Sequence, residues 1–297
     1  MTSKTKHEYI IEVSNLTKFY GKTKGIENVS FHIKEGEIFG LMGPNGAGKT
    51  TTLRSMLNLI QSSSGETRIF SKNLLNLSKI EMSSISYLPG EFEMYGNLTG
   101  KEYLKYLSNL RKAKTNNTDI LADRLDLDLS KKINTLSKGN KQKIGIVMAF
   151  MNKPTIAILD EPTSGLDPLK QQEFQNIVKE YNAEGCSVLL SSHILHEIEE
   201  LCERVGIIKD GNIIASEQIS NLKNKTIKKY EISFDKNPEK LQISKIKGVS
   251  NLNINENIVT FNMQGNIDNL IKTISKHKVI NLRIIEPDLE EIFLTYY

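Results

Sequence analysis

The chain has 297 residues, of which 38% are hydrophobic and 25% charged, as is typical of a globular protein with one large domain or two unequal ones. Its 39 Lys and Arg against 35 Asp and Glu give a net charge of +4 that is spread along the chain, so no nucleic-acid partner is predicted. Two cysteines, no apolar run of about 18 residues and no apolar leader exclude a disulfide framework, secretion and a membrane-spanning chain, and predict a cytoplasmic protein.

Strands are predicted near the N-terminus, at Tyr9–Val13 and Val29–Ile33, where β-branched and aromatic residues gather. A third apolar stretch, Glu37–Met42, runs directly into GPNGAGKTT. Apolar residues then recur with helical spacing at Leu53, Met56, Leu57 and Ile60. A strand, a glycine-rich turn and a helix in this order predict a phosphate-binding βα unit.

The turn itself, Gly43–Thr50, fits the pattern G-x-x-x-x-G-K-[ST]. Its glycines let the backbone wrap phosphates, Lys49 would reach the β- and γ-phosphates, and the Thr50 hydroxyl would ligate Mg²⁺. The positive end of the following helix adds to the attraction for phosphate. The predicted nucleotide-binding residues here are Gly43, Pro44, Asn45, Gly46, Ala47, Gly48, Lys49, Thr50 and Thr51.

A mainly helical insert is predicted over about residues 90–150. It opens with a capping box in which Thr99 and Glu102 can satisfy each other's backbone amides. Apolar residues follow on helical faces at Tyr103, Leu104, Tyr106, Leu107 and Leu110, then at Ile120, Leu121 and Leu125.

Strands and helices alternate after the insert. The predicted strands are Thr155–Asp160, Ser187–Ser192, Val205–Lys209 and Ile213–Ala215, and the predicted helices are Phe174–Tyr181 and His196–Cys202. A hairpin signal, Asp210-Gly211-Asn212, separates the last two strands. The alternation predicts an α/β fold.

A second, smaller α+β domain is predicted after a lysine-rich linker, Lys223–Lys229, so that the domains are residues 1–222 and 223–297. Its predicted strands are Tyr230–Phe234, Leu252–Ile254, Ile258–Met263 and Val279–Ile285, and its predicted helices are Asp268–His277 and Asp288–Tyr296. This order favours a split βαβ arrangement.

Two carboxylates end the apolar strand that follows the insert. A strand that delivers Asp160 and Glu161 to its carboxyl end suits a ligand site at the edge of a parallel sheet. We expect Asp160 to hold Mg²⁺, directly or through water, and Glu161 to polarise the attacking water.

Four further segments lie in an order typical of one family. They are the segment Leu136–Asn140, the segment Ser164–Asp167, His193 after two serines, and the aromatic Tyr20. Together with the phosphate loop, they make residues 8–220 resemble the nucleotide-binding subunit of an ATP-binding cassette (ABC) transporter.

The resemblance implies a role for each of these segments. Tyr20 would stack on adenine, and His193 would be the switch histidine, a catalytic residue within reach of the γ-phosphate. Ser137 and Gly139 would contact the γ-phosphate of ATP held by a second nucleotide-binding domain, so a homodimer is implied.

The resemblance also implies where the chain works. The transport pathway would belong to a separate membrane-spanning permease subunit, docked on the insert at 90–135. The chain would then lie at the inner face of the cell membrane.

The chain departs from the family pattern at several positions. The segment Leu136–Asn140 resembles the marker sequence of the family, but Lys138 and Asn140 replace a glycine and a glutamine of that marker. Gly90 stands where the family has a glutamine that approaches the metal. We expect the next residue, Glu91, to take over as a metal ligand; the alternative is that it contacts the permease.

Two stretches indicate the subgroup. Leu136–Lys143 and Glu286–Leu294 resemble the two-component exporters of drugs and antibiotic peptides, which predicts an ATP-hydrolysing export subunit. One alternative is a soluble ABC ATPase acting on the ribosome or on DNA, but the chain has neither a second cassette nor a long coiled coil. Another is a P-loop GTPase, but Asn152–Thr155 lacks the Asp of the guanine-binding pattern.

Overall fold

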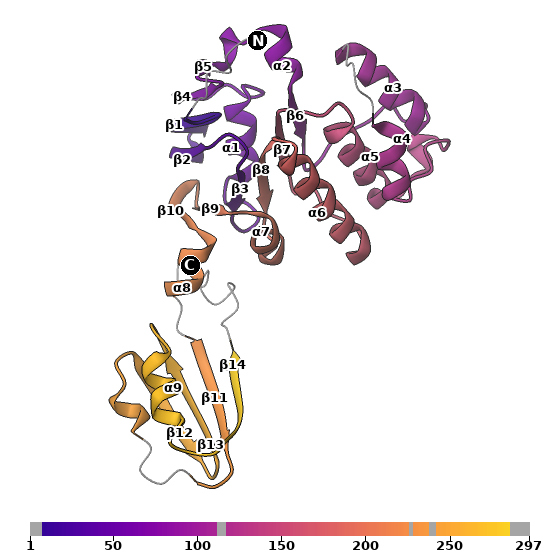
Figure 1. Cartoon of the computed structure of the whole chain (residues 1–297). Helices are drawn as coiled ribbons and strands as arrows, with labels where there is room; N and C mark the ends of the chain where they lie inside the picture. The colour runs from indigo at the N-terminus through magenta and orange to yellow at the C-terminus, as the bar shows by residue number, and fades with distance from the viewer. Residues whose placement is uncertain (1–7, 112–116, 226–227, 238–241, 286–297) are drawn as a thin grey trace, which may run out of the picture. The chain divides into compact units, whose positions relative to one another are not determined.

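The computed structural model describes residues 8–111, 117–225, 228–237 and 242–285 (Figure 1). The chain divides into two compact units, 1–217 and 218–297, each with its own hydrophobic core. The division falls just before α8 (Ile219–Lys225) rather than after residue 222. The predicted linker is wrong where it is described, because its first lysines end α8 and its last two begin β11 (Lys228–Phe234).

A six-stranded sheet forms the centre of the first unit, in the order β10-β9-β3-β8-β7-β6. Its strands are β3 (Ile38–Met42), β6 (Ile85–Leu88), β7 (Ile156–Asp160), β8 (Ser187–Ser192), β9 (Arg204–Lys209) and β10 (Asn212–Gln218). The five strands from β9 to β6 pair in parallel. Their carboxyl ends therefore meet at one edge, where Met42, Asp160 and Ser192 end their strands.

Helices cover both faces of this sheet. On one face, Phe39 and Leu41 share a core with Leu53 of α1 (Lys49–Met56) and with a second sheet. That second sheet is antiparallel, in the order β2-β1-β4-β5. Its strands are β1 (Ile11–Tyr20), β2 (Thr23–Ile33), β4 (Ser64–Ile69) and β5 (Lys72–Asn73). On the other face, α7 (Leu195–Leu201) and α6 (Pro168–Ala183) pack on β8. The α/β fold class is confirmed.

Helices dominate the range 90–150, as predicted. They are α3 (Gly100–Arg111), α4 (Thr118–Arg124) and α5 (Lys138–Phe150), preceded by η1 (Leu74–Asn76) and α2 (Lys79–Ser83) and joined by η2 (Ile133–Thr135). The capping box at the start of α3 is formed: the Thr99 amide donates to Glu102 Oε2 at 2.8 Å, and the Glu102 amide donates to Thr99 Oγ1 at 3.2 Å.

The second unit has an antiparallel sheet in the order β12-β13-β11-β14. Besides α8 and β11, this unit contains η3 (Ile243–Lys245), β12 (Val249–Asn255), β13 (Ile258–Met263), α9 (Asp268–Ile274) and β14 (Val279–Ile285). The connections β11–β12 and β13–α9–β14 each pass over one strand, which is the split βαβ arrangement. The predicted helix at 268–277 ends three residues early, and the one at 288–296 lies outside the described residues.

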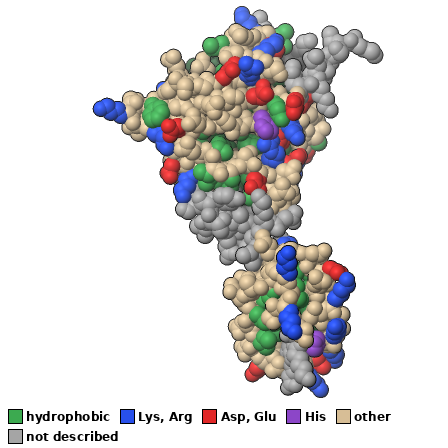
Figure 2. Space-filling model, turned by 90° about the vertical axis from the view of Figure 1, so that its left-hand side faces the viewer, with side chains coloured by type: hydrophobic (Ala, Val, Ile, Leu, Met, Phe, Trp, Pro, Cys, Tyr) green, Lys and Arg blue, Asp and Glu red, His purple; other side chains and the backbone are tan. Residues whose placement is uncertain are grey.

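Alternation along β11 builds the core of the second unit. Tyr230, Ile232 and Phe234 face α9, where Leu270 and Ile274 are buried with them. Several isoleucines of this unit nevertheless stay exposed. Figure 2 shows apolar and basic side chains together on one of its faces.

Candidate nucleotide-hydrolysis site

The glycine-rich loop joins the carboxyl end of β3 to the first turn of α1. Gly46 (φ 83°) and Gly48 (φ 110°) have left-handed backbone conformations that favour glycine. A Cβ at Gly43 would lie 2.4 Å from the carbonyl oxygen of Ile208, so that position has no room for a side chain. Because Gly48 provides no side-chain cap, the first amides of α1 are left for an anion.

Lys49 lies inside this loop and is almost completely buried, with its side chain 6% exposed. Its Nζ donates to the carbonyl oxygens of Gly43 at 2.6 Å and Pro44 at 3.1 Å. It also lies 3.0 Å from Glu161 Oε1. The ammonium group is therefore held in the loop by contacts that phosphate oxygens could replace.

The rest of the loop differs in exposure. Pro44, Asn45 and Gly46 are exposed at its tip, while Ala47 is buried. The Ala47 carbonyl accepts a hydrogen bond from the Gly211 amide at 2.9 Å, so the β9–β10 turn supports the loop from behind.

Asp160 is fully buried at the end of β7, and both of its oxygens accept hydroxyl protons. Thr50 Oγ1 donates to Oδ2 at 2.8 Å, and Ser191 Oγ donates to Oδ1 at 2.5 Å. A hydroxyl and a carboxylate at this spacing fit Mg²⁺, which usually takes one or two protein oxygens and completes its shell with phosphate and water. Among the described residues there is no cluster of three or more His, Cys, Asp or Glu side chains for a metal held by protein alone.

Glu161 and His193 meet at the same edge of the sheet. His193 Nδ1 lies 2.7 Å from Glu161 Oε2, so the carboxylate joins His193 on one side to Lys49 on the other. Glu161 has φ 48°, and its amide donates to the Ser191 carbonyl at 3.1 Å, so its backbone is tied to the end of β8. The structure thus brings together the base, histidine, lysine and metal-ligand candidates.

Gly90, at the position of the family's glutamine, faces Asp160. A Cβ there would lie 3.3 Å from the Asp160 carbonyl oxygen and 3.5 Å from Oδ2. Glu91 is exposed, and its carboxylate makes no hydrogen bond or ion pair with any residue the structure describes. The structure therefore does not bring Glu91 to the metal-ligand candidates.

Tyr20 lies at the end of β1, beside the loop. Its side chain is half exposed, and Lys18 Nζ lies 5.1 Å from the ring centroid. A Cβ at Gly25 would lie 2.9 Å from Tyr20 Cε2 and 3.2 Å from Thr51 Cγ2, so Gly25 lies close to both side chains. Tyr20 therefore lies near the start of α1 with about half of its side chain accessible.

Ser137 and Gly139 lie at the N-terminus of α5. Ser137 is exposed, and its hydroxyl caps the helix by accepting from the Asn140 amide at 3.3 Å. A Cβ at Gly139 would lie 2.6 Å from the Gly165 carbonyl oxygen, so this segment packs on the Ser164–Asp167 loop. None of the hydrogen bonds around Lys49 and Asp160 reaches either residue.

Two residues of the site were not predicted from the sequence. Ser191 bonds Asp160, and Gln142 on α5 donates to the Pro162 carbonyl at 2.8 Å, next to Glu161. Ser191 lies two residues before the predicted switch histidine, and this position could have identified it from the sequence. No sequence pattern identifies Gln142, because its contact depends on how α5 packs.

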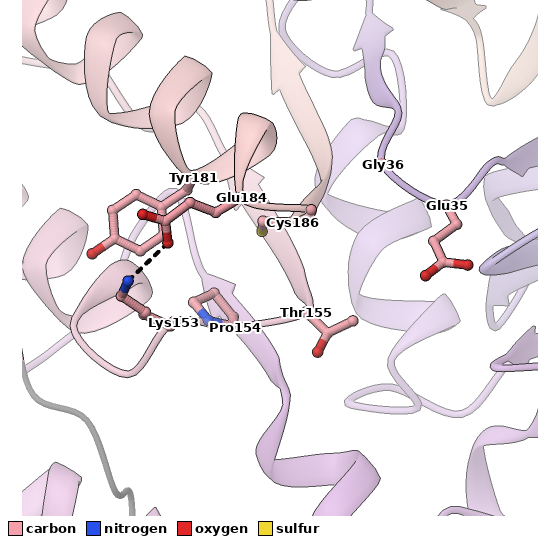
Figure 3. Close-up of a pocket in the computed structure, with 9 residues that line it drawn as sticks. Glu35, Gly36, Lys153, Pro154, Thr155, Tyr181, Glu184 and Cys186 are labelled. Atoms are coloured by element: carbon pink, nitrogen blue, oxygen red, sulfur yellow. Dashed lines mark hydrogen bonds and ion pairs between the residues drawn. The ribbon is translucent and has the colours of Figure 1, made fainter. Parts of the chain in front are cut away.

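A separate hollow lies at the opposite edge of the sheet (Figure 3). It has a volume of about 410 Å³ and is bordered by Gly36, Thr155 and Cys186, which lie just before β3, β7 and β8. Because the glycine-rich loop and Asp160 lie at the carboxyl ends of β3 and β7, this hollow is not the nucleotide site.

The ABC transporter family model matches residues 26–164. Over 238 residues, 77% of this chain and 76% of the relative, the chain is 35% identical to "Bacitracin transport ATP-binding protein BcrA" of Enterococcus faecalis. It is 31% identical to "Linearmycin resistance ATP-binding protein LnrL" of Bacillus subtilis over 302 residues, 96% of this chain and 97% of that one.

Solved structures share the fold of the first unit. An ATP-binding subunit of an ABC transporter matches with a TM-score of 0.66 at 30% identity, covering 72% of this chain and 92% of that one. The dimeric post-hydrolysis cassette MJ0796, bound to ADP and Pi, matches with a TM-score of 0.62 at 27% identity, covering 70% and 98%. With these similarities and the loop geometry, the chain belongs to the ABC transporter family as an ATP-binding subunit that hydrolyses ATP to power transport.

Proposed function

We propose that this chain powers the export of drug-like or antibiotic peptide compounds, as a homodimer on a separate membrane-spanning subunit. The names of two relatives, for bacitracin transport and linearmycin resistance, support the substrate class. No helix of the described residues has the length and apolar character to cross a bilayer, which is consistent with a pathway supplied by another subunit.

The observation that carries the proposal is the group of side chains gathered from the start of α1 and from the ends of β7 and β8. Lys49 would bind the phosphates, and Thr50 and Asp160 would hold Mg²⁺, which supplies charge neutralisation for the phosphates when bound. Glu161 would accept a proton from water as the water oxygen attacks the γ-phosphorus and ADP leaves. His193, 2.7 Å from Glu161, would orient that carboxylate and contact the γ-phosphate.

The exposed marker supports the dimer. Ser137 lies outside the hydrogen-bond network of its own chain's site, at a helix N-terminus that suits an anion. In a head-to-tail pair this segment would close over ATP bound to the partner. ATP would hold the pair together, and loss of the γ-phosphate contacts would let it open.

The insert offers a surface for the membrane subunit. The side chains of Tyr95, Tyr106 and Leu110, here called the insert patch, are exposed by 62%, 45% and 63%. The Tyr95 and Tyr106 ring centroids lie 6.1 Å apart, which makes an aromatic cluster of the kind enriched at protein interfaces. We propose that this patch docks the permease, which would place the chain at the inner face of the membrane.

Glu91 remains a proposed metal sensor. It follows Gly90, which faces Asp160, and a shift of this segment on nucleotide binding could bring its carboxylate toward Mg²⁺. Slower Mg²⁺-ATP hydrolysis by isolated Glu91→Ala supports this role. A defect seen only in the complex with the permease assigns Glu91 to docking instead.

The partner is tested by affinity capture of the tagged chain from detergent-solubilised membranes of its host. We expect a polytopic membrane protein, recovered with wild type and lost with Tyr106→Asp. The control is Leu169→Asp on α6, where Leu169 is 76% exposed and lies outside the insert patch, and this variant should retain the partner. Capture of ribosomal proteins or DNA with wild type in place of a membrane protein would instead support the soluble-ATPase alternative.

A further inference from the structure

One buried carboxylate of the first unit has no part in the proposed chemistry. Glu197 lies on α7 and is only 2% exposed. Both of its oxygens accept hydroxyl protons: Ser192 Oγ donates to Oε2 at 2.7 Å, and Thr163 Oγ1 donates to Oε1. The carboxylate is thus satisfied entirely by two side chains from other segments.

These two hydroxyls belong to the segments that carry the proposed catalytic pair. Ser192 immediately precedes His193, and Thr163 follows Glu161 by two residues. Glu161 and His193 themselves approach to 2.7 Å, with side chains that are 19% and 46% exposed. Glu197 therefore bridges the two segments in the protein interior, while the catalytic pair bridges them at a more exposed position.

The bridge fixes the direction of each segment. Ser192 Oγ accepts from the Ile194 amide at 2.9 Å, which closes the turn around His193. Ser192 Oγ lies closer to Glu197 Oε2, at 2.7 Å, than to the Ile194 carbonyl oxygen, at 3.4 Å, so Glu197 is the nearer acceptor for its proton. On the other segment, the Ser164 amide donates to the Glu161 carbonyl at 3.2 Å, and the Leu166 amide donates to the Thr163 carbonyl at 3.0 Å. Thr163 is therefore part of the tight turn that follows Glu161.

Burying the carboxylate of Glu197 at this position costs free energy. Burial raises the pKa of Glu197, which means that the surroundings disfavour its charged form in spite of the two hydroxyl donors. An apolar side chain would fill a buried position without this cost. What the carboxylate supplies is two acceptors that tie together segments from different parts of the chain.

We propose that Glu197 is a positioning residue for ATP hydrolysis, which holds the segments of Glu161 and His193 at the spacing the reaction needs. The proposal rests on the proposed roles of that pair. Glu197 touches neither nucleotide nor metal ligand, so its loss lowers kcat while ATP affinity is preserved.

The test compares Glu197→Ala, Glu197→Gln and the control Glu200→Gln in the full chain. Glu200 is an exposed glutamate of the same helix, paired with Lys179 at 3.6 Å. We expect Glu197→Ala to lower kcat by about 10- to 100-fold, the scale of a catalytic group displaced by about 1 Å. The KM for ATP should stay within about twofold because the phosphate contacts are untouched. Glu197→Gln should recover most of the activity, because its amide can still bond both hydroxyls.

A second pair of variants covers the case in which Glu197→Ala fails to fold. Thr163→Val and Ser192→Ala each remove one of the two donors and should each lower kcat. Their combination with Glu197→Ala, or with each other, should cost less than the product of the single effects, as for residues acting as one unit. Wild-type kcat in folded Glu197→Ala, or in the Thr163→Val/Ser192→Ala double variant, overturns the proposal.

The experiment distinguishes a failure of the positioning role of Glu197 from a failure of the proposed role of Glu161. If Glu161→Gln is inactive and Glu197→Ala is fully active, only the positioning role fails. If Glu161→Gln hydrolyses ATP at the wild-type rate, the proposed base itself is wrong.

Discussion

Replacing Lys49 by alanine should weaken ATP binding itself, because it removes the one ammonium held among the loop carbonyls. Each hydrogen bond from an ammonium to a charged acceptor contributes about 1.5–3 kcal/mol. In the free protein, Lys49 already contacts the Gly43 carbonyl at 2.6 Å and Glu161 at 3.0 Å. Since ATP must displace some of these contacts, we expect a net loss of about 2–3 kcal/mol, or about 30- to 150-fold in Kd.

The assay is a direct titration of the isolated chain with ATP by calorimetry, so that binding is separated from turnover. Lys153→Ala is the control, because Lys153 pairs with Glu184 at 2.8 Å at the opposite edge of the sheet. It should leave the Kd unchanged. An affinity of Lys49→Ala within about twofold of wild type would refute the assignment of Lys49 to the phosphates.

Three further outcomes are expected. Tyr20→Ala should weaken ATP binding by about 1–3 kcal/mol, the range of a base–aromatic stack, and unchanged affinity would leave Tyr20 a packing residue. His193→Ala should lower kcat by about 10-fold or more with ATP affinity preserved, and normal turnover would remove it from catalysis. Burial raises the pKa of Cys186 to about 12 and also raises the pKa of Cys202, so neither thiol should react with a thiol reagent at pH 8 until urea unfolds the chain; rapid labelling of the native protein would contradict their burial.

Much of the fold was predictable because the strands carry either apolar runs, in the parallel sheet, or alternating apolar residues, in the antiparallel sheet of the second unit. Ser187–Ser192 and Ile258–Met263 were predicted with the bounds that the structure has. β1 was predicted only as far as Val13. The register against β2 shifts after that residue, and Asn15 has φ 48°, so the alternation of apolar residues is interrupted.

The helix after the phosphate loop was predicted too long. It ends at Met56, and Asn58 has φ 52°, a left-handed conformation that stops helices and that asparagine tolerates. Leu57 still packs on the core from outside the helix, so its helical spacing was misleading. The asparagine was a signal that the apolar period obscured.

The candidate site was predicted as a set of residues but not as a geometry. Asp160, Glu161 and His193 each end or follow an apolar strand, and adjacent parallel strands bring such ends together. The exposed carboxylate of Glu91 was not predictable, because the segment after β6 has no periodic pattern to fix its direction. The network behind the site at Glu197 depends on long-range packing that spacing does not encode.

The measurement that tests the account most directly is the mass of Glu161→Gln in solution with ATP and with ADP. This change keeps the shape of the side chain but removes the proposed base, so ATP should bind without being hydrolysed. Light scattering during size exclusion should find a dimer with Mg²⁺-ATP and a monomer with ADP, with phosphate release nearly abolished. A variant that stays monomeric with ATP and still hydrolyses it at the wild-type rate would contradict both the base and the ATP-bound pair.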